Sequence, residues 1–332
     1  MTEVLFDTTC IGNAIVDVIG KTDEEFLIKE NLTKSSMMLI DADRAEDLYA
    51  KMSAAMEMSG GSAGNTAAGV ASLGGKSAYV GKVRDDQLGA IFRHDIEAIG
   101  VTFETEMSTH GAATARCLVL VTPDAHRTMN TYLGACIELG PDDIDPEMIA
   151  GSKITYMEGY LWDPEGGKQA FRKAAKISHG AGQRVALTLS DPFCVDRYRE
   201  EFLDFMRDGV DILFANEDEV KSLYQTDDFD TALAAVRGHV DIACLTRSEK
   251  GSVIVSGDEV HAVPAEGNVN VVDTTGAGDL FAAGFLYGIT NGHELASSGR
   301  IGSIAAAEII SHYGARPAVN LKELVDGKLQ SA

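Results

Sequence analysis

The stretch DTTGAGDLFAAGFLYG, residues 273–288, contains the residues that decide the fold and the chemistry of this chain. Its second part has the small and apolar residues of a buried helix, and two of its glycines lie where that helix begins. We expect Gly276, Ala277 and Gly278 to lie in the first turn, where backbone N–H groups have no partner within the helix. Small residues and the helix dipole favour a bound anion there. Asp279 would then lie beside an anion site.

An aspartate beside an anion site has two interpretations. A carboxylate repels a permanently bound anion, but it is useful where it takes a proton from an attacking hydroxyl group. Alternatively, Asp279 only stabilises the helix N-terminus through its negative charge. The four residues 276–279 leave both interpretations open.

Two common phosphate-binding motifs do not fit this sequence. VASLGGKS, residues 70–77, has Val70 where a P-loop requires glycine. A dinucleotide fingerprint that starts at Gly276 would need its third glycine at the position of Phe281. The missing fingerprint also makes a nicotinamide dehydrogenase a poor interpretation.

The composition is that of an ordinary soluble globular protein. Hydrophobic residues make up 45% and charged residues 24% of the 332 positions. The net charge is −23, from 51 acidic and 28 basic residues. A negative field repels phosphate backbones and anionic lipids, so we expect no nucleic acid or membrane partner.

The cysteines and the amino terminus predict a cytoplasmic protein. MTEVLFDTTC, residues 1–10, lacks the basic stretch and apolar run of a secretory signal. The cysteines lie apart, without a CxxC pair and in apolar surroundings, as buried free thiols do in a reducing compartment: Cys10, Cys117, Cys136, Cys194 and Cys244.

Short β-branched runs alternate with helical patterns over most of the chain. This alternation predicts a three-layer α/β fold with a mostly parallel central sheet. Residues 14–40 and 105–135 carry strands with little helix between them, and we expect them to form a small antiparallel β-sheet lid. Residues 1–332 are therefore predicted to form a single domain with this lid.

Three segments together resemble one family. DTTGAGDLFAAGF is similar to the carboxy-terminal signature of the PfkB, or ribokinase-like, carbohydrate and nucleoside kinases. GGSAGNTAAGVASLGG, residues 60–75, is similar to their amino-terminal signature, and NEDE, residues 216–219, resembles their N-x-x-E motif. The resemblance extends from about Asp7 to Gly314. It implies a ribokinase-like fold and an ATP-dependent kinase.

The resemblance also implies roles for the quoted residues. Asp279 would remove the proton of the acceptor hydroxyl, and the amides of residues 276–278 would stabilise the transferring phosphoryl group. Asn216 and Glu219 would order the water shell of Mg²⁺, although Asn216 can equally well cap a helix. A monovalent cation such as K⁺ would lie near Asp273, Thr275 and Gly314.

The amino-terminal half would bind the acceptor. By resemblance, Asn13 and Asp17 follow the first strand, and the Asp17 carboxylate holds the hydroxyls of a ribose diol; the alternative is a plain turn residue. Gly61, Ser62 and Asn65 would face the substrate, although the glycines of residues 60–64 could simply permit a tight turn.

Within the family, the sequence resembles the adenosine kinases more than ribokinase. GNAIVDV, residues 12–18, and LSDPF, residues 189–193, are similar to segments of those kinases. Phe193 would stack on the nucleobase and Arg127 would reach the phosphates, but a core phenylalanine and a solvated arginine remain alternatives. Asp191 departs from the small residue found in that segment, which leaves the shape of the base pocket open.

The predicted function is therefore transfer of a phosphoryl group from ATP to a primary hydroxyl, most simply the 5′-hydroxyl of adenosine or a related purine nucleoside. The alternative within the family is a sugar kinase acting on a ribose- or fructose-like substrate. A non-catalytic nucleotide-binding regulator is the alternative from another class, and retention of Asp279 argues against it. We expect a monomer or a homodimer.

Overall fold

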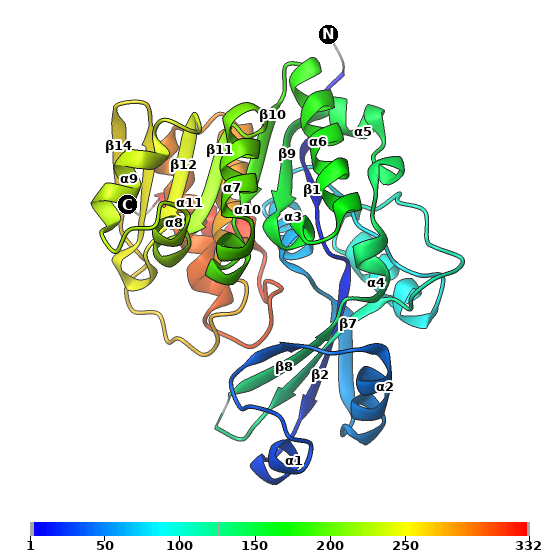
Figure 1. Cartoon of the computed structure of the whole chain (residues 1–332). Helices are drawn as coiled ribbons and strands as arrows, with labels where there is room; N and C mark the ends of the chain where they lie inside the picture. The colour runs from blue at the N-terminus through cyan, green and yellow to red at the C-terminus, as the bar shows by residue number, and fades with distance from the viewer. Residues whose placement is uncertain (1–2, 125, 331–332) are drawn as a thin grey trace.

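The larger of the two β-sheets runs through the centre of the molecule (Figure 1). In this computed structural model, which describes residues 3–124 and 126–330, its strand order is β14-β13-β12-β11-β10-β9-β1-β5-β6. Pairing is parallel from β12 to β6 and antiparallel from β12 to β14. The strands are β1 (Phe6–Ile11), β5 (Ser77–Val80), β6 (Val101–Thr102), β9 (Ser152–Glu158), β10 (Arg184–Thr188), β11 (Ile212–Asn216), β12 (Ile242–Thr246), β13 (Ser252–Ser256) and β14 (Glu259–Val263).

Helices cover both faces of this sheet because successive side chains of its strands point to opposite faces. Cys10 of β1 is buried in one core and its neighbour Ile11 in the other. One core is covered by α3 (Ser62–Ser72), α4 (Gln87–Ala98), α10 (Ala277–Thr290), α11 (Leu295–Ile309) and α12 (Leu321–Gln330). The other is covered by α5 (Pro146–Ala150), α6 (Glu165–Gly180), α7 (Pro192–Gly209), α8 (Glu217–Leu223) and α9 (Phe229–Val236). The predicted three-layer α/β fold is confirmed.

The smaller sheet projects from the carboxyl edge of the larger one (Figure 1). Its order is β3-β8-β7-β2-β4, with strands β2 (Ile15–Lys21), β3 (Met37–Leu39), β4 (Ala55–Ser59), β7 (Ala115–Val121) and β8 (Arg127–Tyr132). The helices α1 (Glu24–Lys29) and α2 (Ala42–Lys51) pack beside it. The sheet lies at the carboxyl edge because β2 begins four residues after β1 ends.

The small sheet differs from the prediction in two respects. It is mixed rather than antiparallel, because β2 pairs with β7 in parallel and β3 pairs with β8 in parallel. The sheet also includes β4, and α2 packs beside it, although both lie between the predicted segments 14–40 and 105–135. A parallel pair arises here because β2 and β7 are joined by a long connection that runs through the larger sheet, whereas a short hairpin joins only β7 to β8.

The described residues also form short 3₁₀ turns: η1 (Gly134–Glu138), η2 (Pro141–Asp143), η3 (Gly159–Trp162) and η4 (Ser248–Lys250). Within the described residues, no helix has the length and apolar character needed to cross a bilayer. The division into one domain and a lid stays a prediction.

Candidate active site

The two glycine-rich segments meet at the junction of the two sheets. Asp279 is the third residue of α10, and its carboxylate accepts hydrogen bonds from the side chains of two residues of α3. Ser62 Oγ donates to Asp279 Oδ1 at 2.6 Å, and Asn65 Nδ2 donates to Asp279 Oδ2 at 2.8 Å. The chain therefore brings residues more than two hundred positions apart into direct contact.

The start of α10 has unpaired amides beside Asp279. Gly276 adopts the left-handed conformation, with φ of 79°, and precedes the first helical residue. Among the described residues, the amides of Gly276 and Gly278 have no hydrogen-bond partner. The amide of Ala277 differs from the expectation, because it donates to Thr274 O at 3.2 Å. Gly276 is thus the cap rather than part of the first turn, and two of the three predicted donors are open to an anion.

The surroundings of Asp279 suit a general base. Burial raises the pKa of the Asp279 carboxyl, while the hydrogen bonds from Ser62 and Asn65 and the charge of Arg316 lower it. A carboxylate with a raised pKa accepts a proton more readily than an ordinary aspartate, but it must remain ionised to do so. Burial and these hydrogen bonds act on Asp279 in opposite directions, and the net effect is a raised pKa.

Arg316 is a site residue that the sequence did not reveal. It lies in the loop between α11 and α12, and its Nη1 donates to Asn65 Oδ1 at 2.6 Å. Its Nη2 donates to Ser59 Oγ, at the end of β4, at 2.9 Å. A single arginine in the segment GARP, residues 314–317, carries no motif that could have indicated this position.

Asp17 lies on β2 of the smaller sheet and faces the same group of charges. Burial raises its pKa to about 6, with Asp279 adding to the rise and the cations Arg316 and Arg127 opposing it. A side chain on Gly60 would meet the Asp17 carboxylate, at 2.5 Å from its Oδ2. β2 thus presents the Asp17 carboxylate, a hydrogen-bond acceptor, beside Gly60, which comes shortly before α3.

A buried glutamate holds Asn13 and the start of α3 in place. Glu158, at the end of β9, accepts from Asn13 Nδ2 at 3.0 Å and from the amide of Ala63 at 2.8 Å. Gly61 has φ of 83°, and a Cβ there would lie 2.2 Å from Asn13 O, so only glycine fits. Burial raises the pKa of Glu158 to about 7. The sequence showed KITYMEGYL only as a strand, so this residue was missed.

Arg127 contacts the predicted cation position. Its Nη2 lies 2.6 Å from Asp273 Oδ2, and its Nη1 lies 3.5 Å from Thr275 Oγ1. Asp273 also accepts from the Thr275 amide at 3.1 Å and from the Gly314 amide at 3.2 Å. The structure therefore brings Asp273, Thr275 and Gly314 together. The positive charge beside Asp273 is that of Arg127, which belongs to β8 of the smaller sheet. Arg127 is not solvated, because its side chain is only 9% exposed.

Asn216 and Glu219 form a capping box at the start of α8. Asn216 Oδ1 accepts from the Glu219 amide at 2.9 Å, and Glu219 Oε2 accepts from the Asn216 amide at 2.9 Å. Burial is the main cause that raises the pKa of Glu219 to about 7, and the charges of Asp191, Asp218 and Asp279 add to it. The capping role is therefore real. No group of three or more His, Cys, Asp or Glu in the part of the chain described here could by itself hold a metal ion.

Phe193 is not a core residue. It lies in the first turn of α7, after the end of β10, and 68% of its surface is exposed. The guanidinium of Arg197 lies 4.6 Å from the centre of its ring. An exposed aromatic ring at the carboxyl edge of a parallel sheet is available to stack on a planar ligand.

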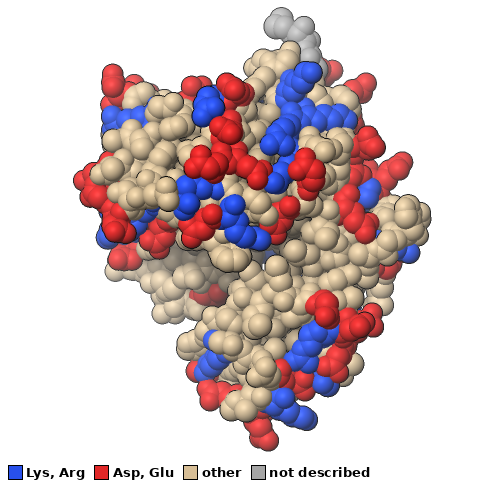
Figure 2. Space-filling view, in the orientation of Figure 1, with Lys and Arg blue, Asp and Glu red and all other residues tan. Residues whose placement is uncertain are grey.

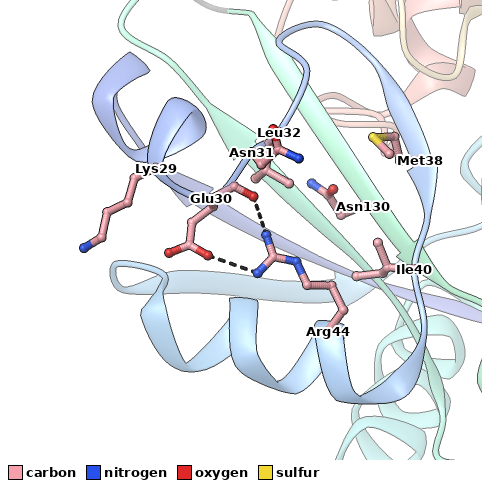
Figure 3. Close-up of a pocket in the computed structure, with 8 residues that line it drawn as sticks. All are labelled: Lys29, Glu30, Asn31, Leu32, Met38, Ile40, Arg44 and Asn130. Carbon is pink, nitrogen blue, oxygen red and sulfur yellow. Dashed lines mark hydrogen bonds and ion pairs between the residues drawn. The ribbon is translucent and has the colours of Figure 1, made fainter.

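A separate cavity of about 460 Å³ lies on the other face of the smaller sheet (Figure 3). Arg44 and Glu30 form an ion pair at its rim, and Asn130 of β8 lies at its back. Asn130 and Arg127 are an odd number of residues apart on β8, so their side chains point to opposite faces. Since Arg127 points to Asp273, this cavity is not part of the site around Asp279.

The surface view agrees with a site between the two parts of the molecule. In Figure 2, acidic and basic side chains are spread over the body and over the smaller sheet, and the hollow between them shows mainly uncharged surface. Unpaired amides beside a partly buried carboxylate, at the carboxyl edge of a parallel sheet, fit a phosphotransferase that acts on an alcohol group.

Comparison with known proteins agrees with this class. Residues 7–321 match the pfkB family of carbohydrate kinases, and the chain belongs to that family. It is 26% identical over 326 residues to an adenosine kinase of Saccharomyces cerevisiae, covering 92% of this chain and 94% of that protein.

Two solved structures are similar over nearly the whole chain. A probable sugar kinase from Rhizobium etli CFN 42 is 54% identical, with a TM-score of 0.91 and coverage of 99% of both chains. An adenosine kinase from Sinorhizobium meliloti is also 54% identical, with a TM-score of 0.90 and coverage of 98% of this chain and 99% of the other. The resemblance to the PfkB kinases is confirmed.

Proposed function

We propose that this kinase transfers a phosphoryl group from ATP to the 5′-hydroxyl of adenosine or a related purine nucleoside. The observation that carries the proposal is the 54% identity, over 98% of this chain, with the adenosine kinase from Sinorhizobium meliloti. The exposed ring of Phe193 supports it, because a nucleoside has a base on which that ring can stack and a free sugar has none.

The residues around Asp279 supply the chemistry of transfer. The Asp279 carboxylate takes the proton of the acceptor hydroxyl while that oxygen attacks the γ-phosphorus in line, the bond from the γ-phosphorus to the bridging oxygen breaks, and ADP leaves. The amides of Gly276 and Gly278 donate hydrogen bonds to the equatorial oxygens of the transferring group. Asp17 and Asn13 hold the ribose hydroxyls. Ser62 and Asn65 fix the orientation of the Asp279 carboxylate, because each donates a hydrogen bond to one of its two oxygens.

The residues at the start of α8 fit a magnesium ion held through water. Glu219 is a buried carboxylate whose pKa is raised mainly by burial and further by the charges of Asp191, Asp218 and Asp279, and a divalent cation would favour its ionised form. Mg²⁺ prefers oxygen ligands and retains several waters. When bound with ATP, Mg²⁺ neutralises negative charge on the phosphates, and Asn216 and Glu219 would orient its water shell.

A monovalent cation near Asp273 is a separate part of the proposal. Thr275 and Gly314 already donate to the Asp273 carboxylate, and Arg127 forms an ion pair with it. A potassium ion would face the like charge of Arg127, so these residues do not fit K⁺ while Arg127 is in this place. Movement of Arg127 to the phosphates of ATP would leave the Asp273 carboxylate to a cation.

A sugar kinase is the second candidate, and the 54% identity with the probable sugar kinase from Rhizobium etli favours it. The test is release of ADP from ATP with a panel of nucleosides and sugars at one concentration. We expect adenosine to give the highest kcat/KM. A higher value for ribose or fructose would assign the protein to the sugar kinases, and no ADP release with any acceptor would contradict a kinase.

The charge and the cysteines support a cytoplasmic enzyme that binds small molecules. The net charge of −23 disfavours nucleic acid and membrane surfaces as partners. The five cysteines are buried free thiols, as expected in a reducing compartment. Whether the enzyme is a monomer or a homodimer is decided by light scattering in solution.

A further inference from the structure

Arg316 joins two elements near Asp279, because it donates hydrogen bonds to Asn65 of α3 and to Ser59 of β4. We propose that Arg316 is a positioning residue of the active site, whose guanidinium holds Asn65 so that the Asn65 amide points at Asp279, and which also ties β4 of the smaller sheet to the site through Ser59. This inference deepens the proposed function and rests on it.

Asn65 lies between Arg316 and Asp279 and forms a hydrogen bond with each. Its Oδ1 accepts from Arg316 Nη1 at 2.6 Å, and its Nδ2 donates to Asp279 Oδ2 at 2.8 Å. A guanidinium can only donate and an ionised carboxylate can only accept. A flipped Asn65 amide would place donor against donor and acceptor against acceptor, so Arg316 permits only the orientation in which Asn65 holds Asp279.

The second contact of Arg316 joins the smaller sheet to the same network. Nη2 donates to Ser59 Oγ at 2.9 Å, and the Ser59 amide donates to Asp95 Oδ2 of α4 at 2.7 Å. Ser59 is the last residue of β4, three positions before α3 begins. Arg316 therefore fixes the end of β4 and the first turns of α3 relative to each other. A shorter side chain, or one with a single donor nitrogen, could not make both contacts.

The charges around Arg316 give the proposal a measurable consequence. Burial lowers the pKa of Arg316, while Asp17 of β2, Asp95 of α4, Asp279 of α10 and Tyr79 of β5 oppose this. In return, Arg316 lowers the pKa of Asp17 and of Asp279. Among the other charged groups, Arg127 of β8 lowers the pKa of Asp17, and Asp279 raises the pKa of Glu158 of β9. Loss of the Arg316 charge would therefore raise the pKa of both aspartates, and a base with a higher pKa is ionised only at higher pH.

Three substitutions separate the charge of Arg316 from its hydrogen bonds. In Arg316→Met and Arg316→Gln, which remove the charge, we expect kcat/KM to fall by roughly 10- to 100-fold, the effect of losing a charged hydrogen bond. The acid limb of the pH profile should also move to higher pH, because the positive charge that lowers the pKa of Asp279 is lost. Arg316→Lys should keep the acid limb in place but lose activity, because an ammonium cannot hold Asn65 and Ser59 together.

The control is Arg300→Met in α11. Arg300 is partly buried and pairs with Glu266, away from Asp279, so its loss should lower the melting temperature without moving the pH profile. If Arg316→Met does not fold, Arg316→Gln and Arg316→Lys make the same comparison. An acid limb in Arg316→Gln that overlays the wild-type limb, or one that moves equally in Arg316→Lys, would overturn the proposal.

A second readout does not depend on turnover. The Asp279 carboxyl carbon can be titrated by NMR in the wild type and in Arg316→Gln, and we expect the midpoint to rise in the variant. An unchanged midpoint contradicts the role of Arg316 even if the enzyme is a kinase. A raised midpoint in a protein that phosphorylates no member of the acceptor panel supports the role of Arg316 and contradicts the proposed function instead.

Discussion

Glu158 accepts a hydrogen bond from the amide of Ala63 at 2.8 Å, so a strand of the larger sheet holds the start of α3. The cap position of α3 is Gly61, which has no side chain to satisfy the free amides of the first turn. A carboxylate from β9 replaces the usual serine or aspartate cap. Ser62 and Asn65 are therefore positioned by a residue whose own hydrogen bonds go to Asn13 and Ala63.

The titration of Glu158 makes stability depend on pH. Its pKa is raised from 4.5 to about 7 in the folded protein, so the folded state binds this proton more tightly than the unfolded chain. The corresponding stability is fully present below pH 4.5 and is lost as the pH rises through 7, by about 3 kcal/mol at most. In Glu158→Gln we therefore expect a smaller fall in the melting temperature between about pH 5 and pH 8.

The exposed Glu249→Gln variant is the control for that measurement, and its melting curve should follow the wild type at every pH. Calorimetry over this range gives the comparison. If Glu158→Gln shows the same fall as the wild type, the proton held in the folded state does not reside on Glu158.

Removal of the negative charge of Glu219 should weaken the apparent affinity for magnesium. In Glu219→Gln we expect a higher Mg²⁺ concentration for half-maximal rate and a smaller change in KM for the acceptor. Asp218→Asn is the matched control, because Asp218 lies in the same turn of α8 with its side chain 79% exposed. Initial rates at a series of Mg²⁺ concentrations decide the matter: an unaltered midpoint together with a lower melting temperature would leave only the capping role.

Phe193→Ala separates a nucleoside from a sugar as acceptor. Loss of a ring that stacks on a base costs about 1–3 kcal/mol, which is roughly a 5- to 150-fold loss in kcat/KM for adenosine. Any activity with ribose should change little, and so should the melting temperature, because the ring is 68% exposed. Steady-state kinetics with both acceptors and one melting curve test this. Equal losses for adenosine and ribose would exclude stacking on the base.

The layers of the fold were predictable because they depend on local patterns. Alternating β-branched runs and helices indicate a parallel sheet covered on both faces, and the main chain follows that plan. The pairing of β2 with β7 was not predictable, since no turn connects these strands and the register follows from the larger sheet. β4 (Ala55–Ser59) was missed because AMEMS has no β-branched residue, which leaves its strand character to the pairing with β2.

The site divides in the same way. Asp279, Ser62 and Asn65 lie in glycine-rich segments with a recognisable sequence, and the structure brings them together. Glu158 and Arg316 are single charged residues whose sequence surroundings are unremarkable. Their roles arise only when β9 and the loop after α11 meet α3, so no local pattern could indicate them.

The most direct test of the account is the turnover of Asp279→Asn with ATP and the best acceptor of the panel. A positioned general base contributes a factor of roughly 10²–10⁴, so we expect kcat to fall by that amount. The affinity for ATP should change little, because the amides of Gly276 and Gly278 remain. Single-turnover kinetics beside an equilibrium ATP titration measures both quantities. A variant with near-wild-type turnover would contradict the assignment of Asp279 as the base.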